Sequence, residues 1–336
     1  MPEIKNKSKK SKTDSEKDAA LIRKARSRAS EGATYWKDNW AAAEDDLNFL
    51  SGDQWPAGIK NEREKDSRPC LVNNVLPTFV DQVLGDQRQN RPAIKVSPVD
   101  MIQVQAPGTD KPESLKISSL SGGKDYELAE VMTGLVKNIE YNCDAETSYD
   151  IAFQAALESS MGFLRVRTDY LAEDTFDQDV IIDHIENQFS VTLDPNAREH
   201  DYSDMNWAFI HDSMPKDDFE EKYPGKPTDA VTGESVVGEG VEWTTQSTVT
   251  VSEYFTREPV TKEMALLSDG RAVFMDEIEP VLDELAAKGV TVERTRKVKT
   301  FKVVWRLITG QDVLEGPVEM ACTTIPVVPV WGKCLV

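Results

Sequence analysis

The first half of the chain begins with apolar residues that recur at alternating steps of three and four. These positions are Ile22, Ala25, Ala29, Ala33, Trp36, Trp40, Ala43, Leu47 and Leu50. Such spacing keeps side chains on one side of a helix. The pattern predicts one long amphipathic helix, weakened but not stopped by Gly32. The helix should end at Ser51-Gly52, because glycine readily adopts the left-handed conformation that closes a helix.

A second helix is predicted after Trp55, a polar loop and Arg68-Pro69. Asn74 should cap it, and Pro77 is acceptable in its first turn, where a missing N–H costs little. Its apolar stripe is Leu76, Phe79, Val80, Val83 and Leu84. The polar run 85–92 follows, and Ile94 and Val96 then alternate as in a strand.

Residues 100–124 read as a linker, and two further helices follow it. The first starts near Asp125 and carries an apolar stripe of Leu128, Val131, Met132, Leu135, Val136 and Ile139; the second carries Tyr149, Phe153, Ala156, Leu157 and Ser160. Gly162 is predicted to close the second helix. Alternating strands are expected at 163–167, 180–185, 189–193 and around Trp207, and a short helix at 215–223.

The pattern changes after residues 226–248, which are poor in core residues. A hairpin is predicted at 265–273 on a Ser-Asp-Gly turn, then a helix that begins near Ile278 and stops at Gly289, and a long strand over 290–308. We therefore predict an α+β protein in which a helix-rich region with a mixed sheet is followed by a small α/β domain.

The chain has 39 basic and 59 acidic residues among 336, a formal charge of −20, although its first 30 residues hold ten basic and four acidic residues. An acidic body argues against gripping nucleic acid with the general surface, because phosphate binding needs cationic side chains. Neither a signal peptide nor a membrane span is recognisable. The four cysteines and three histidines lack metal-ligand spacing, so reduced thiols and no metal or cofactor are expected.

Several short motifs occur in a characteristic order. They are Phe49 to Trp55 (FLSGDQW), Arg68-Pro69, Asn73-Asn74, Gly85, Arg88 to Pro92 (RQNRP) and Ile325 to Gly332 (IPVVPVWG). In this order the chain resembles the portal protein, or head-to-tail connector, of tailed double-stranded DNA bacteriophages of the short-tailed type. The segment 194–224 extends the resemblance.

The resemblance implies a structural protein of the virion, without enzymatic activity, assembled in the host cytoplasm. A ring of twelve copies would occupy one capsid vertex, nucleate head assembly, and pass double-stranded DNA inward at packaging and outward at ejection. The implied partners are the terminase large subunit, tail adaptor proteins, and the scaffolding and coat proteins, with no membrane. An acidic channel wall would repel DNA and prevent sticking; alternatively, the acidity only maintains solubility.

The resemblance also gives a domain map. We expect a disordered basic tail over 1–18, a portal wing-like α+β region over 19–245, a clip-like α/β domain over 246–322, and over 323–336 the start of a segment returning toward the stem. In the family the chain continues through a stem helix, a tunnel loop and a helical crown. The sequence therefore has the pattern of a truncated portal.

Two sets of residues are candidates for contacts with other proteins. The subunit-interface candidates, weighed against ordinary packing and turn contacts, are Trp55, Arg68, Arg88 and Arg91. The clip docking candidates, weighed against a solvated strand face that resists edge aggregation, are Arg294, Arg296, Lys302 and Arg306. Alternation along a strand would place these last four on one face, with Lys297 and Lys299 on the other.

Two other functions remain as alternatives. The carboxylates Asp177, Asp179, Asp183, Glu186 and Asp194 would suit a metal-dependent phage nuclease, because paired carboxylates can hold Mg²⁺ for phosphodiester cleavage. A chain so rich in acidic residues supplies such a cluster by chance. The other alternative is a soluble acidic adaptor that stays monomeric and binds one protein. Phosphate-binding loops and nucleophile motifs are missing.

Overall fold

The computed structural model describes residues 12–91, 93–97, 101–104, 113–116, 124–172, 174–227, 247–268, 272–279, 282 and 289–332. The helices are α1 (Lys12–Ser51), α2 (Ala57–Lys65), α3 (Leu76–Gln89), α4 (Lys124–Asn142), α5 (Ala145–Ser159), α6 (Lys216–Lys222) and α7 (Met275–Ile278). The strands are β1 (Met101–Val104), β2 (Glu113–Lys116), β3 (Met161–Tyr170), β4 (Gln178–His184), β5 (Val191–Leu193), β6 (Trp207–Pro215), β7 (Thr248–Leu267), β8 (Ala272–Phe274), β9 (Val292–Ile308), β10 (Val313–Met320) and β11 (Val327–Trp331). The predicted α+β class is confirmed.

The chain folds into two compact units that are interleaved in sequence. Unit 1 consists of Met1–Ala42 and Asn187–Val328, and unit 2 consists of Ala43–Glu186 and Pro329–Val336. This division differs from the expected boundary at 245/246, because β6 and β7 lie on either side of that boundary and pair over nine residues, from Trp207↔Thr256 to Pro215↔Thr248.

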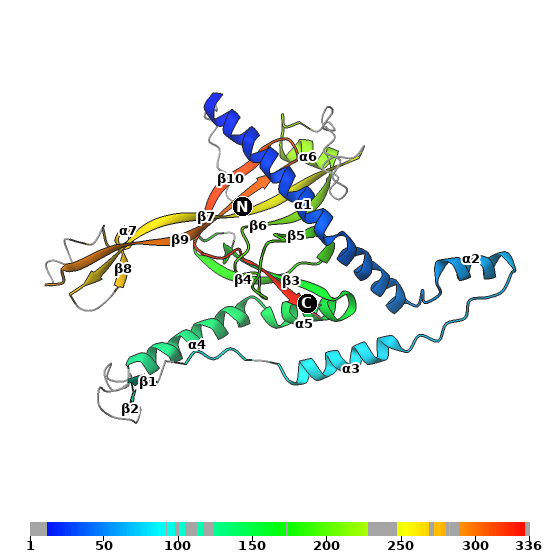
Figure 1. The fold of residues 1–336 in the computed structure, drawn as a ribbon, viewed down its shortest axis with the longest axis horizontal. Coiled ribbons are helices and arrows are strands. Elements are labelled where there is room, and N and C mark those ends of the chain that lie inside the picture. The colour runs from blue at the N-terminus through cyan, green and yellow to red at the C-terminus, as the bar shows by residue number, and fades with distance from the viewer. Residues whose placement is uncertain are drawn as a thin grey trace. The chain divides into compact units, whose positions relative to one another are not determined.

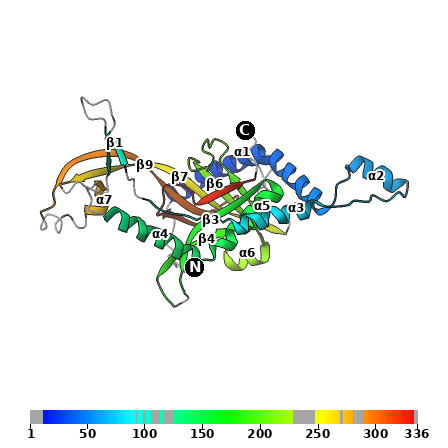
Figure 2. The same cartoon turned by 90° about the horizontal axis from the view of Figure 1, so that it is seen from below.

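Unit 1 is built on a six-stranded sheet in the order β10-β9-β7-β6-β5, with β8 paired to β7 (Figure 1). Every pairing in this sheet is antiparallel. The mixed sheet was predicted for the region 19–245, which contributes β5 and β6 here, and these two strands pair antiparallel. β7 and β9 extend far beyond the other strands as a two-stranded ribbon, with α7 beside its far end (Figure 2), where β8 pairs with β7. The predicted hairpin between β7 and β8 is confirmed, while its turn at 269–271 lies outside the described residues.

The apolar stripe of α1 packs on this sheet. Its small residues Ala25 and Ala29 are fully buried together with Trp207, Phe209 and Tyr254. Further along the helix, the Trp36 indole donates a buried hydrogen bond of 3.1 Å to the Leu193 carbonyl. The predicted long helix is therefore confirmed and provides one wall of the core of unit 1.

Gly32 lies on the face of α1 that packs against Thr192 and Trp207 of the sheet. A Cβ at this position would collide with the Thr192 side chain and press on the Trp207 ring. The sequence interpretation treated Gly32 only as a weak point in the helix. In the structure it is a packing requirement, since only glycine leaves room beside the helix for the Thr192 and Trp207 side chains.

His211 lies on β6, within unit 1. Its ring stacks on Phe209 at 5.5 Å, Nδ1 is 2.7 Å from Ser252 Oγ, and Nε2 is 3.3 Å from Thr192 Oγ1. Burial disfavours the charged ring and lowers the pKa of His211 from 6.5 to about 4. The folded protein therefore holds a neutral histidine there at neutral pH.

Unit 2 contains the three-stranded sheet β11-β3-β4, and α5 packs against β3 and β4. Two glycines allow close contact with α5: a Cβ on Gly162 in β3 would collide with the Ala152 carbonyl oxygen, and one on Gly332 after β11 with the Ala156 carbonyl oxygen. Trp331 also packs edge-on against Phe163 at 6.4 Å. The motif VWG near the end of the chain is thus a packing motif of unit 2.

Several local predictions differ from the structure. The polar loop after Pro56 contains α2, which buries none of its residues and therefore shows no apolar periodicity. Val75 is the N-cap of α3, while Asn74 Oδ1 accepts a hydrogen bond from the Leu76 N–H at 3.3 Å. Ser160, at φ +66°, ends α5, so Gly162 serves close packing and does not cap the helix.

The N-terminal region also differs, because α1 begins at Lys12 inside the segment 1–18 that was expected to be disordered; residues 1–11 lie outside the described residues. Most of the predicted helix after Ile278 falls on residues that are not described, although Gly289 does have a positive φ of 79°. None of the described helices is long and apolar enough to cross a membrane.

We predict that alanine at Gly162 or Gly332 destabilises the protein by about 1–3 kcal/mol, because the added methyl group displaces the backbone of α5. Chemical denaturation of the purified variants measures this difference. Gly134→Ala in α4 is the matched control, since a Cβ there meets no atom within 4 Å and alanine favours the helix. Equal midpoints for all three variants would contradict the packing argument.

We also predict a pH-dependent stability that arises from His211. The unfolded chain binds a proton at this histidine below pH 6.5, whereas the folded chain does so only near pH 4, so stability falls as pH falls through this window. A shift of this size corresponds to about 3 kcal/mol. Denaturation of the wild type and of His211→Gln at pH 7.5 and 4.5 isolates the effect, and the loss should be smaller in the variant. Identical pH dependence in both proteins would exclude His211 as its source.

Candidate interaction surfaces

The clip docking candidates lie on one face of β9, as the alternation predicted. The β7–β9 register pairs Arg294 with Leu266, Arg296 with Met264, Lys302 with Glu258 and Arg306 with Tyr254. The structure separates these four basic residues into an inner and an outer pair with different surroundings.

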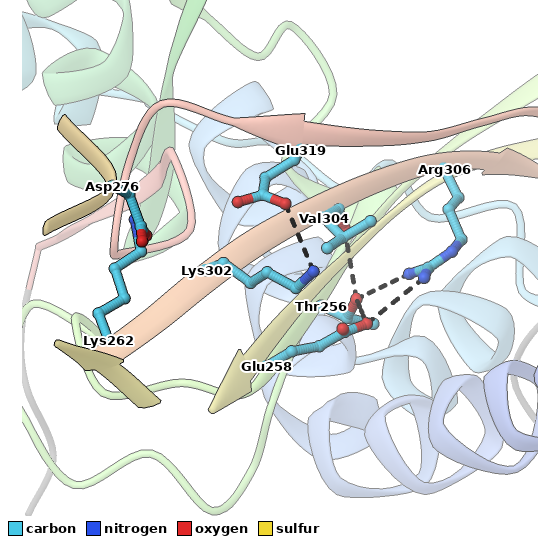
Figure 3. Close-up of polar contacts among 8 residues, drawn as sticks. All are labelled: Thr256, Glu258, Lys262, Asp276, Lys302, Val304, Arg306 and Glu319. Carbon is cyan, nitrogen blue, oxygen red and sulfur yellow. Dashed lines mark hydrogen bonds and ion pairs between the residues drawn. The ribbon is translucent and has the colours of Figure 1, made fainter. Parts of the chain in front are cut away.

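The inner pair is engaged within unit 1 (Figure 3). The Arg306 side chain is only 13% exposed; it donates a 2.9 Å hydrogen bond to Thr256 Oγ1 and lies 3.4 Å from a Glu258 oxygen. Lys302 Nζ lies 3.4 Å from a Glu319 carboxylate oxygen on β10. These contacts join β7, β9 and β10, so both residues contribute to the sheet itself.

The outer pair is exposed. Arg294 and Arg296 have no ion-pair partner among the residues that the structure describes, and Arg296 Nη2 lies 3.9 Å from Met264 Sδ. On β7, the neighbouring Lys262 lies 3.7 Å from Asp276 of α7. Of the four basic residues on this face of β9, only Arg294 and Arg296, on the outer half of the β7–β9 ribbon, therefore remain available for docking.

A pocket of about 670 Å³ lies in unit 1 between the sheet and the part of α1 from Ala20 to Glu31. Arg28 of α1 donates a 2.7 Å hydrogen bond to the Tyr254 hydroxyl at its floor. Burial raises the pKa of Tyr254, while the nearby Arg28 and Arg306 act in the opposite direction. Asp194, also lining the pocket, accepts hydrogen bonds from Asn196 and Asn206. These polar groups bond one another and form no recognisable catalytic arrangement.

The subunit-interface candidates Trp55 and Arg68 lie in unit 2, around α2. The Trp55 indole donates a 3.2 Å hydrogen bond to the Leu71 carbonyl, and the Arg63 guanidinium lies 4.8 Å from its ring centroid. Arg68 is exposed and 3.8 Å from Asp66. Trp55 therefore holds the α2 segment together, and Arg68 is available at the surface.

Arg88 and Arg91 converge on α5. Their guanidinium groups lie 3.3 Å and 2.7 Å from Asp150 Oδ2, and Arg91 also pairs with Glu146. Gln87 donates to the other Asp150 oxygen at 3.2 Å. The Asp150 side chain is only 11% exposed, and a buried carboxylate is stabilised by such paired cations. Sequence analysis missed Asp150, because its partners lie some 60 residues earlier and no spacing connects them.

Two apolar helix faces in unit 2 are exposed to solvent. The "α3 face" consists of Val75, Phe79 and Val83, with exposed fractions of 50%, 61% and 42%. The "α4 stripe" consists of Leu128, Val131, Met132 and Leu135, exposed by 60%, 66%, 48% and 58%. Phe79, Val83 and all four residues of the α4 stripe belong to the apolar stripes that the sequence predicted for these helices, whereas Val75 is the N-cap residue of α3. Exposed apolar patches of this kind mark protein contact sites.

The carboxylates of the nuclease alternative are used in other ways. Asp183 pairs with Arg167 at 2.6 Å, and Asp179 accepts a hydrogen bond from Asn142 at 3.3 Å. Within the described ranges, no three His, Cys, Asp or Glu side chains form a group that could hold a metal ion. The arrangement required for two-metal cleavage is therefore not present among these residues.

Comparison with known proteins agrees with the motif order. The family model described as phage P22-like portal protein matches residues 26–336. The portal protein of Acyrthosiphon pisum secondary endosymbiont phage 1 is 24% identical over 297 residues, which are 84% of this chain and 38% of that protein. The chain thus spans well under half the length of this relative. It belongs to the phage P22-like portal protein family.

Proposed function

We propose that this protein forms the ring at the capsid vertex through which phage DNA is packaged and ejected. The proposal rests on the family match over residues 26–336, together with the α3 face and the α4 stripe. Apolar helix faces left in water are unfavourable in a monomer, and a neighbouring copy would bury them. A closed ring, a dodecamer by family resemblance, would provide that neighbour for every copy.

The finer roles follow from this assignment. The exposed outer half of the β7–β9 ribbon, with Arg294 and Arg296, would dock the terminase large subunit during packaging and the tail adaptors afterwards. Scaffolding and coat proteins would contact the ring in the head, and double-stranded DNA would pass through its centre. The energy for packaging would come from terminase, so the purified chain should not hydrolyse ATP.

The acidic adaptor is the second candidate function. The exposed basic pair Arg294 and Arg296 on the ribbon supports this function only to the extent that binding one acidic partner protein would account for it. An adaptor would differ from a ring-forming portal in that it stays monomeric and binds a single protein.

We expect the purified chain to form rings of about a dozen copies with a central hole. Native mass spectrometry over a range of concentrations measures the stoichiometry, and negative-stain imaging shows the hole. A chain that stays strictly monomeric would remove support for ring formation by this part of the protein and favour the adaptor.

A further inference from the structure

We propose that the pocket of unit 1 between α1 and the sheet binds a small oxyanion, that is, a molecule that carries a carboxylate or a phosphate group. The proposal goes beyond ring formation and does not depend on it, because all residues that line the pocket belong to unit 1 of a single copy. The pocket volume of about 670 Å³ lies within the usual range of about 300–1,000 Å³ for small-molecule sites. The charge of the pocket then decides which kind of molecule fits.

Two arginines from different elements converge on the Tyr254 hydroxyl at the floor of the pocket. Arg28 of α1 donates a 2.7 Å hydrogen bond to this oxygen, and Arg306 of β9 is paired with Tyr254 in the β7–β9 register. Burial raises the pKa of Tyr254, and the positive charges of both arginines oppose this effect, which places both guanidinium groups near the hydroxyl. Two like charges held this way repel each other unless a negative group lies between them.

The carboxylates of the pocket neutralise this positive charge only in part. Asp194 accepts four hydrogen bonds, all from Asn196 and Asn206, and these use both of its oxygens. Glu258 lies 3.4 Å from Arg306, whose other hydrogen bond goes to a neutral hydroxyl group (Figure 3). The lining holds four basic and three acidic residues, although the chain as a whole has 39 basic and 59 acidic residues.

Two cations of α1 have no carboxylate partner among the residues that the structure describes. Lys24 and Arg28 lie one turn apart on the same side of the helix and both line the pocket, and neither forms an ion pair with the exposed Glu31. Arg257 also lines the pocket, but its guanidinium group stacks on the Phe301 ring at 3.8 Å. No guanidinium nitrogen of Arg28 is both buried and unpartnered, so its remaining donors are accessible to a ligand.

This arrangement of donors suits an oxyanion. A guanidinium group presents its N–H donors in a planar fork that matches two oxygens of a carboxylate or a phosphate. Arg28 and Arg306 would bind such a group from two sides, and Lys24 would add a third, flexible charge. The apolar part of the ligand would contact Leu21 and Trp207, which also line the pocket. A bound anion would therefore connect α1 with β9.

The test is isothermal titration calorimetry of the purified chain with two probes, sodium phosphate and sodium citrate, at an ionic strength held constant with sodium chloride. We expect one saturable site per chain for at least one probe, because chloride lacks the paired oxygens that a guanidinium fork binds. Binding of both probes supports the shared chemistry, binding of phosphate alone assigns the site to tetrahedral oxyanions, and binding of citrate alone assigns it to carboxylates. If neither probe shows saturable binding, the proposal is wrong.

Variants of α1 assign the binding to this pocket. Lys24→Gln and Arg28→Gln should each lower the affinity for the bound probe about tenfold or more, because each removes one charge-assisted contact. Arg23→Gln is the matched control, since Arg23 is exposed beside Lys24 on the same helix and does not line the pocket. Unchanged affinity in both pocket variants, or an equal loss in the control, would contradict the assignment.

Folding of the variants is checked by circular dichroism. Arg28→Gln also removes a hydrogen bond to Tyr254 and can therefore weaken the contact between α1 and the sheet. Lys24→Gln changes an exposed side chain that has no carboxylate partner among the described residues. It therefore keeps the test decisive if Arg28→Gln does not fold.

Hydrogen exchange measured by mass spectrometry locates the bound probe. Amide exchange should become slower in α1 around Lys24 and in β9 around Arg306, because a ligand that binds only the folded state opposes local opening. Slower exchange confined to other segments would overturn the proposal even where binding is saturable. Ring formation is judged separately, from the native mass of the chain without either probe, so the two proposals can fail independently.

Discussion

Close packing at three glycines is the constraint on which both units depend. Gly32 brings α1 onto the sheet of unit 1, and Gly162 and Gly332 bring β3 and the end of β11 onto α5 in unit 2. Each contact joins segments that are far apart in sequence or belong to different kinds of element. Because interiors are packed as densely as organic crystals, a single added methyl group must move side chains of the sheet at Gly32 and the backbone of α5 at Gly162 and Gly332. The buried alanines of α1 serve the same purpose along the rest of the helix.

Apolar periodicity predicted the elements well where their apolar face packs against other parts of the same chain. The α1 stripe, the β7–β8 hairpin and the long β9 strand all follow from apolar spacing, because one face of each meets a core. α2 was missed for the converse reason, since a helix that buries nothing leaves no apolar pattern. Asp150 was missed because ion pairing across α3 and α5 has no sequence period.

The interaction surfaces could be predicted only in part, for two physical reasons. Alternation placed Arg294, Arg296, Lys302 and Arg306 on one face, but their partners lie on other strands, so only the structure separates the engaged inner pair from the exposed outer pair. The α4 stripe has the same spacing as the α1 stripe, and yet one is exposed and the other buried. Amphipathic spacing indicates that one face of a helix is suited to burial away from water. It does not indicate whether the surface that covers this face belongs to the same molecule.

The interleaving of the two units has a consequence for the order in which the protein can fold during synthesis. The residues that contact α1 in unit 1 leave the ribosome long after α1 itself. Trp36 donates a hydrogen bond to Leu193, and Arg28 donates one to Tyr254, both of which are synthesised much later. Unit 2 in turn takes its strand β11 from beyond residue 326, after all of β3 and β4 have been made. We therefore expect neither unit to close before the chain has emerged almost to β11. Until then, nascent chains would expose the apolar face of α1 and an open sheet edge, which favours prompt binding by chaperones.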